Sequence, residues 1–270
     1  MGMMYEWIYL NGRGAMASSE GNTVSGKELL DIVPPEIMRF LLTRVKPSKH
    51  IDFDPGEGLI SLADEYERLE QRYHQKLSNI EHKGISESSR KEQQMIDEAR
   101  KFELAQVKRH GTDHKDSLGI SFSHLSTICQ IKSRQENLLS SLSRTHGINV
   151  QNPDARLLDR VNRMRNWIRS DWFPESAKIE LSKSIEISNF NENEINFLKD
   201  FTKNAYSMIW DEESIQKGIK MTISESDLSP KDAFTTLYRC LLDRRRGPKL
   251  APLLVELGQG EVLALLEMVK

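Results

Sequence analysis

The sequence predicts a mainly α-helical protein that begins with a short α/β region and continues as a helical bundle. From residue 59 onward, apolar residues recur at three- and four-residue steps, the spacing of a buried helix face. Residues 5–10 instead have the aromatic and β-branched content of a strand. The chain lacks the repeated alternation of strands and helices that would build a large parallel sheet.

Composition excludes several classes of protein. Of the 270 residues, 38% are hydrophobic and 29% charged, and the formal net charge is −2. A protein that coats nucleic acid indiscriminately would be strongly basic, although a selective RNA binder can gather its cations on one face. No run approaches the roughly 20 apolar residues that cross a bilayer, and no leader is expected. Cys129 and Cys240 match no disulfide or zinc pattern and are expected to be reduced and buried.

Several helices follow from local signals. The pair Ser25 and Glu28 has the spacing of a capping box, and Pro35 is suited to the first turn of a second helix. Apolar stripes predict further helices over residues 59–77, 86–110 and 121–145, the last closed by Gly147.

Residues 14–22 form a stretch of small and polar side chains between the strand and the first helix, Gly-Ala-Met-Ala-Ser-Ser-Glu-Gly-Asn. Small residues allow backbone N–H and hydroxyl groups to approach a triphosphate. A plain surface loop would have the same composition, so both interpretations stay open on these residues alone. The candidate nucleotide-contacting residues are Met16, Ser18, Ser19, Gly21 and Asn22.

This loop resembles the mobile KMSKS loop in the Met-x-Ser-Ser-x-Gly-Asn form of class I lysyl-tRNA synthetases. Segments 35–41, 49–54 and 64–68 follow in the order and approximate spacing of that family, and residues 237–252 are similar to its closing segment. The resemblance is strong over about residues 5–70 and 230–258 and weak between them.

The resemblance implies the C-terminal portion of such an enzyme, in three parts. Residues 1–58 would hold the KMSKS-like loop and a region that touches the tRNA stem. Residues 59–150 would connect it to a helical anticodon-binding bundle over residues 151–270. The intact enzyme would be a cytoplasmic ligase that uses ATP with magnesium to join lysine to its tRNA. The partners of this chain would be the tRNA for lysine and the missing N-terminal catalytic half, with no membrane and no DNA.

The sequence departs from the family pattern in ways that bear on catalysis. Ala15 and Ser18 occupy the two lysine positions of the loop, and Glu20 adds negative charge. The His-x-Gly-His signature is absent from the sequence. We therefore expect the chain alone to be inactive, with no complete set of catalytic residues and no tightly bound cofactor.

Residues 152–172 have the clearest RNA-binding character. Asn152 or Asp154 can cap a helix here. Arginine can bind phosphate bidentately and aromatic rings can stack on unpaired bases. Alternatively, the tryptophans are core residues and the arginines pair with nearby acidic residues, including Asp154 and Asp159. The candidate tRNA-binding residues are Arg163, Arg165, Trp167, Arg169 and Trp172.

A second basic cluster follows a helix near the end of the chain and consists of Arg239, Arg244, Arg245, Arg246 and Lys249. Cations there also complement a helix C-terminus, so a structural role is equally compatible. His110 and His114 are four residues apart but lack a third ligand, and no metal site is expected.

Other function classes remain open at this point. The chain could be a freestanding tRNA-binding module without catalysis, or a helical scaffold that does not bind RNA. A glutamyl-type class I synthetase would share the bundle architecture, although residues 35–68 favour the lysyl type.

Overall fold

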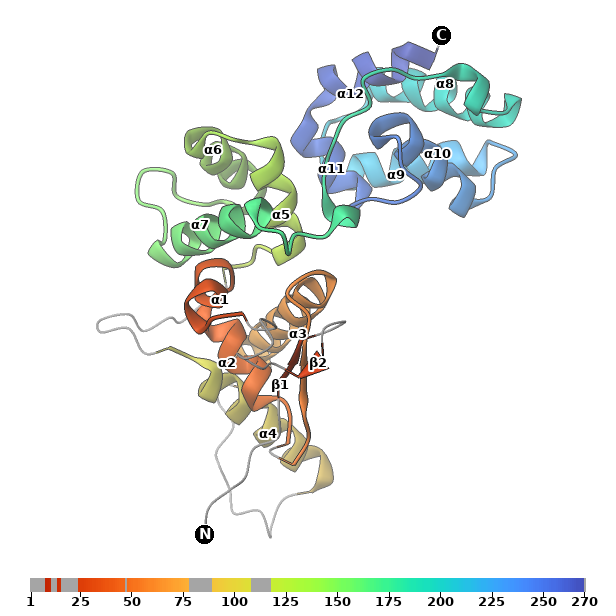
Figure 1. The fold of residues 1–270 in the computed structure, drawn as a ribbon. Coiled ribbons are helices and arrows are strands. Elements are labelled where there is room, and N and C mark those ends of the chain that lie inside the picture. Colours follow the sequence, from red (N-terminus) through yellow and green to blue (C-terminus); the bar gives the residue numbers. More distant parts are fainter. Residues whose placement is uncertain are drawn as a thin grey trace, which may run out of the picture. The chain divides into compact units, whose positions relative to one another are not determined.

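The computed structural model describes residues 8–10, 14–15, 24–46, 48–77, 89–107 and 118–269. The chain divides into two compact units. Unit 1 comprises residues 1–126 and 142–173, and unit 2 comprises residues 127–141 and 174–270. The predicted mainly α class with a small α/β region is confirmed (Figure 1). Residues 151–173, which we assigned to the C-terminal bundle, belong instead to unit 1.

Unit 1 contains a small sheet in the order β2-β1-β3, formed by β1 (Ile8–Leu10), β2 (Gly14–Ala15) and β3 (Ile51–Phe53). Strand β1 pairs antiparallel with β2 and parallel with β3. A parallel pair requires a crossover connection, and α1 (Gly26–Ile32) and α2 (Pro35–Thr43) lie within that connection.

The first two helices begin where local chemistry predicts. Ser25 accepts a hydrogen bond from the Glu28 amide, and the Glu28 carboxylate accepts one from the Ser25 amide, which completes the capping box. Pro35 occupies the first turn of α2. The buried face of α2 consists of Ile37, Phe40 and Leu41.

Helix α3 spans Glu57–Arg72. Asp54 lies just before it, and its two carboxylate oxygens accept hydrogen bonds from the Gly56 and Gly58 amides at 2.8 and 2.9 Å. The helix continues as a π-helical turn, η2 (Tyr73–Leu77). Helix α4 (Arg90–Ala105) begins with a second capping box at Ser89 and packs against α2. Its buried residues are Ile96, Ala99, Phe102 and Ala105.

The predicted helix over residues 121–145 is in fact two helices, α5 (Phe122–Ile131) and α6 (Gln135–His146). Their apolar residues keep one helical spacing across the break, so periodicity could not reveal it. Gly147 follows α6 with φ +67°, as its predicted closing role requires. Helix α7 (Ala155–Arg169) is capped by Asp154.

Unit 2 is helical throughout its regular structure. Two short 3₁₀ turns, η4 (Glu175–Ala177) and η5 (Ile187–Asn189), precede the main helices. Unit 2 also includes the end of α5 and the start of α6, within residues 127–141. Its other elements are α8 (Glu192–Ser207), α9 (Glu212–Ser224), α10 (Pro230–Leu242), α11 (Leu250–Leu257), α12 (Gln259–Leu266) and η6 (Glu267–Val269).

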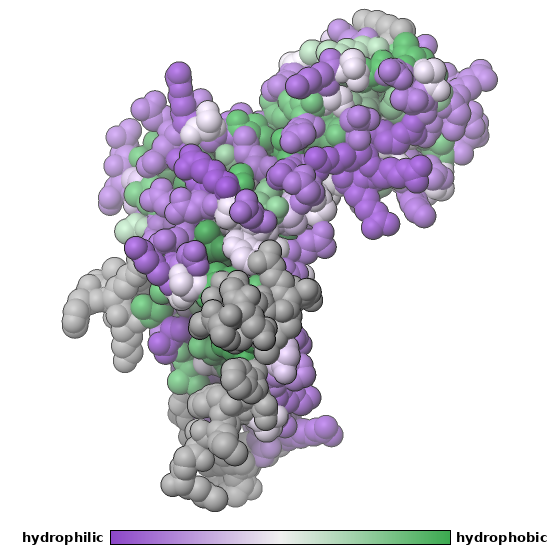
Figure 2. Space-filling view, viewed as in Figure 1, coloured by the Kyte–Doolittle hydropathy of each residue, from purple (hydrophilic) through white to green (hydrophobic). Residues whose placement is uncertain are grey.

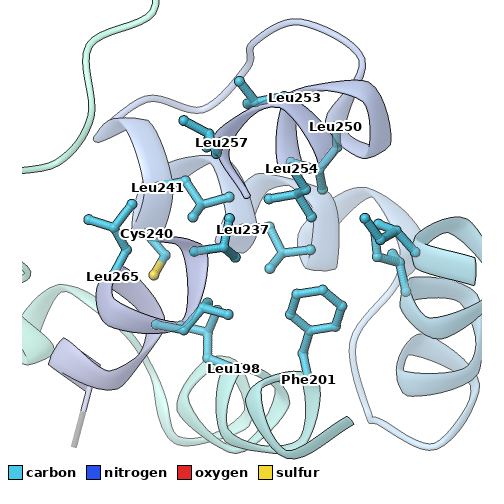
Figure 3. Close-up of a cluster of buried hydrophobic side chains, with 14 of the residues drawn as sticks. Leu198, Phe201, Leu237, Cys240, Leu241, Leu250, Leu253, Leu254, Leu257 and Leu265 are labelled. Carbon is cyan, nitrogen blue, oxygen red and sulfur yellow. The ribbon is translucent and has the colours of Figure 1, made fainter. Parts of the chain in front are cut away.

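A leucine-rich core holds these helices together (Figure 3). Leu198 and Phe201 of α8 face Leu237 and Leu241 of α10, and Leu254 of α11 closes the cluster (Figure 3). Cys240 is buried in the same core, and both cysteines are free. Burial of this apolar surface is the main force that stabilises the unit.

The visible surface of α8 to α12 is mostly hydrophilic (Figure 2). Among the helices that the structure describes, none is both long and apolar enough to cross a membrane.

Candidate nucleic-acid interface

The predicted nucleotide-contacting residues Met16, Ser18, Ser19, Gly21 and Asn22 lie outside the described residues. The elements that flank them are described. Tyr9 pairs with Ala15 and Leu10 with Gly14 in the sheet. The capped start of α1 follows at Ser25. The strand and the helix therefore flank the loop as the sequence indicated.

Helix α7 carries the predicted tRNA-binding arginines and has a clear inner side. Leu157, Val161 and Met164 are each about 1% exposed. Asp154 accepts a hydrogen bond from the Arg156 amide and pairs with the Arg156 guanidinium at 2.7 Å. The outer residue Asn166 donates to the Asp31 backbone carbonyl, which ties α7 to α1.

Arg163 is held in a bidentate ion pair on the surface of α7. Its Nε and Nη2 donate to the two carboxylate oxygens of Asp159 at 2.9 and 3.1 Å. The structural alternative paired the arginines with Asp154, Asp159, Asp171 and Glu175, and this pair and the Arg156–Asp154 pair are two of those it predicted. Arg163 must exchange Asp159 for phosphate in order to bind RNA.

Trp167 does not lie on the surface. Its side chain is 0% exposed, its ring packs against Phe122 and Phe173, and its indole N–H donates to the Pro55 carbonyl at 2.7 Å. The prediction that this ring stacks on a base is wrong for this structure, because its position on α7 faces the core. The spacing of Trp167 three residues after Met164 was the available signal.

The other three candidates remain at or near the surface. Arg169 is exposed at the end of α7, and Arg165 is partly buried one turn before it. Trp172 is partly buried in the segment that follows, where its backbone N–H donates to the Ser170 hydroxyl oxygen at 3.3 Å. Arg165 and Arg169 are four residues apart and so share one face of the helix.

A buried cluster of charged and polar groups lies under α7, and sequence reasoning did not find it. Arg160 is 8% exposed and pairs with Glu36 of α2 at 3.4 Å. Glu67 and Glu70 of α3 are also buried close to it. Gln106 donates to the hydroxyl of buried Tyr66 at 3.2 Å. The cluster thus connects α2, α3 and α7.

Burial has a strong effect on one carboxyl in this cluster. Desolvation raises the pKa of Glu67 to about 8, although nearby Arg160 lowers it. The adjoining cavity of about 30 Å³ has room for one or two water molecules and is lined in part by Glu36, Glu70 and Arg160. A nucleotide does not fit there. The cluster is therefore structural and sets the position of α7.

The second basic cluster divides into inward and outward residues. Arg239 pairs with Glu194 at 2.8 Å, and Arg244 donates to the carbonyls of Glu175 and Lys178. Both are therefore structural. The outward cations Arg245, Arg246 and Lys249 are exposed, and in the described part of the chain no ion pair involves them.

Metal chemistry has no support in the described ranges, where no cluster of three ligand-type side chains occurs. His110 and His114 lie outside the described residues.

Comparison with known proteins connects these surfaces to a family. Residues 1–108 match the family described as tRNA synthetases class I (K). A lysine–tRNA ligase of Thermoplasma volcanium is 31% identical over 99% of this chain and 48% of its own length. The corresponding protein of Picrophilus torridus is 32% identical over 97% and 47%. That of Borreliella burgdorferi is 29% identical over 94% and 46%.

The similarity covers the predicted loop, α7 and unit 2 alike, including the central region where the sequence resemblance was weak. The chain spans about half the length of the curated relatives it matches. The predicted recognition is confirmed: over nearly all its length, this chain is related to the class I lysyl-tRNA synthetases.

Proposed function

We propose that this chain is the tRNA-binding, C-terminal part of a lysine–tRNA ligase. The observation that carries the proposal is the match of nearly the whole chain to about half of each of several lysine–tRNA ligases. Those relatives are named for joining lysine to tRNA, so the tRNA for lysine is the partner we propose here. In the intact enzyme, ATP with magnesium would activate lysine.

The tRNA would contact the outer face of α7 through Arg165 and Arg169, with Trp172 beside them. Arginines on one helix face can bind successive phosphates, while a partly buried tryptophan offers a ring to an unpaired base. Arg163 would contribute least, because its bidentate pair with Asp159 has to be given up first.

A substitution series tests this surface. Replacing Arg169 or Arg165 by Gln is expected to weaken binding of lysine tRNA about two- to fivefold each, the range for an exposed ionic contact. Each change should also make the dependence of affinity on salt less steep. Arg163→Gln should have the smallest effect of the three.

Lys220→Gln provides the control, because Lys220 is an exposed cation on α9 in unit 2. Fluorescence anisotropy with a labelled lysine tRNA measures the tRNA affinity of all four variants. Equal affinities for wild type, Arg165→Gln and Arg169→Gln would remove α7 from the interface.

We also propose that catalysis needs a second part of the enzyme. Ser18, Ser19, Gly21 and Asn22, with Met16, would approach ATP phosphates only when the nucleotide is held by a catalytic domain. The chain alone should therefore show no lysine-dependent exchange of pyrophosphate into ATP. Exchange above background by the isolated chain would contradict this.

A further inference from the structure

A second surface of unit 2 has the features of a nucleobase pocket. It is a half-open hollow of about 380 Å³, within the range of pockets that bind small molecules. Its lining comes from the segment before α8 and from the end of α10, and includes Ser184, Glu186, Asn189, Phe190, Arg239 and Asp243.

One side of the pocket is a fixed planar cation. The Arg239 guanidinium lies 4.4 Å from the centroid of the Phe190 ring. It also pairs with the Glu194 carboxylate at 2.8 Å and donates to the Asn189 carbonyl. These contacts hold the guanidinium in one orientation and offset its charge. A fixed guanidinium plane is a surface on which a base can stack.

The rim carries hydrogen-bonding groups that are available to a ligand. Ser184, Glu186, Asn189 and Asp243 are all exposed. Within the described part of the chain, none of their side chains has a hydrogen-bond partner. The carboxylates of Glu186 and Asp243 accept hydrogen bonds only, while the Asn189 amide both donates and accepts. Two carboxylates disfavour a phosphate inside the pocket but suit the N–H groups on the edge of a base.

The backbone places Asp243 next to the outward cations. Asp243 follows α10 in the left-handed conformation, with φ 52°, which Asp tolerates better than most residues. After the intervening Arg244, the exposed residues Arg245 and Arg246 follow. The loop thus places a carboxylate at the pocket, where the N–H groups of a base would lie. It places cations close by, where the adjoining phosphates would lie.

We propose that this pocket takes one unpaired base of the bound tRNA, with the adjoining phosphates on Arg245 and Arg246. The proposal rests on the proposed function, since it assigns a second contact of the same partner. A basic peptide would also suit the carboxylates, but the exposed arginines beside the pocket would repel it.

The test uses the full chain, lysine tRNA and the double variant Asn189→Ala/Asp243→Asn. Asn tolerates the left-handed conformation at position 243, and Asn189→Ala keeps the carbonyl that Arg239 uses. We expect affinity to fall about tenfold or more, which is the scale of a lost base contact, with an unchanged salt dependence. Arg245→Gln/Arg246→Gln should instead reduce the salt dependence.

Chemical probing of the bases identifies the ligand directly. Wild type should protect one unpaired base of lysine tRNA, and the double variant should lose that protection while its thermal unfolding is unchanged. Asp200→Asn, an exposed carboxylate on α8, is the matched control and should behave as wild type. Glu186→Gln replaces the double variant if that protein does not fold.

The possible failures are distinguishable. If wild type binds tRNA and the pocket variants give the same affinity and the same protected bases, the pocket proposal is wrong and the proposed function stands. If wild type shows no binding to lysine tRNA, the proposed function fails and the pocket proposal fails with it.

Discussion

At the scale of single residues, burial separates the structural groups on α7 from the surface groups. Trp167 is in the core and donates to a backbone carbonyl, whereas Trp172 is only partly buried. The sequence presents the two rings five residues apart with similar polar neighbours. The spacing of Trp167 three residues after buried Met164 indicates the inner side of α7, but the contact with Pro55 is tertiary and no local pattern contains it.

A pair of conservative substitutions distinguishes these roles. Trp167→Phe should lower the free energy of unfolding by about 1–3 kcal/mol, because it leaves the buried Pro55 carbonyl without its donor. Lysine tRNA should still bind with unchanged affinity. Trp172→Phe should show the opposite pattern, with weaker binding and little loss of stability.

Urea denaturation measures the free energy of unfolding of both variants, and titration with lysine tRNA measures their affinity. A loss of tRNA affinity in Trp167→Phe without a loss of stability would show that the Trp167 ring reaches the RNA.

The buried carboxyl of Glu67 predicts a dependence of stability on pH. Its pKa is raised from the ordinary value of 4.5 to about 8, so the folded protein holds a proton that the unfolded chain releases. The stabilisation is fully present below pH 4.5 and is lost as pH rises through 8. Arg160, Asp64 and Glu70 are the charged neighbours that modify this pKa.

Comparing wild type with Glu67→Gln isolates the effect. Between pH 6 and pH 9 the free energy of unfolding of wild type should fall more than that of the variant, as measured by urea denaturation. Parallel pH profiles for the two proteins would show that Glu67 is ionised in the folded state across this range.

At the scale of elements, the sequence predicted the helix starts well and the internal breaks poorly. The capping box at Ser25 and the first-turn position of Pro35 depend on neighbouring residues alone, and both predictions are confirmed. The π-helical turn after α3 packs against α4, which is distant in sequence, and the break between α5 and α6 leaves the apolar spacing unchanged. Periodicity carries no information about either.

Two glycines in helical first turns provide a matched test of element packing. A Cβ at Gly58 would lie 2.4 Å from the Asp54 Cβ, whereas a Cβ at Gly26 meets nothing within 4 Å. Gly58→Ala should therefore lower the free energy of unfolding by about 1–3 kcal/mol through overpacking at the start of α3. Gly26→Ala should be neutral or slightly stabilising.

Thermal and urea unfolding of the two alanine variants measure the difference. Equal free energies of unfolding for Gly58→Ala and Gly26→Ala would show that Asp54 can move away from the new Cβ without loss of stability.

At the scale of the whole molecule, sequence reasoning reached the family but divided the chain differently. The resemblance in the loop and in the closing segment indicated a lysyl-tRNA synthetase, and similarity along nearly the whole chain supports that relationship. Residues 151–173 pack with unit 1 because Leu157, Trp167 and their neighbours bury against its helices. Such long-range packing sets the unit boundary.

The most direct test of the proposed function is a titration of the unmodified chain with lysine tRNA and with an unrelated tRNA. Binding should be tighter for lysine tRNA, and affinity for both should fall between about 50 and 200 mM salt as phosphate contacts weaken. Equal affinity for the two tRNAs at both salt concentrations, or no binding to either, would contradict the proposal that this chain recognises the tRNA for lysine.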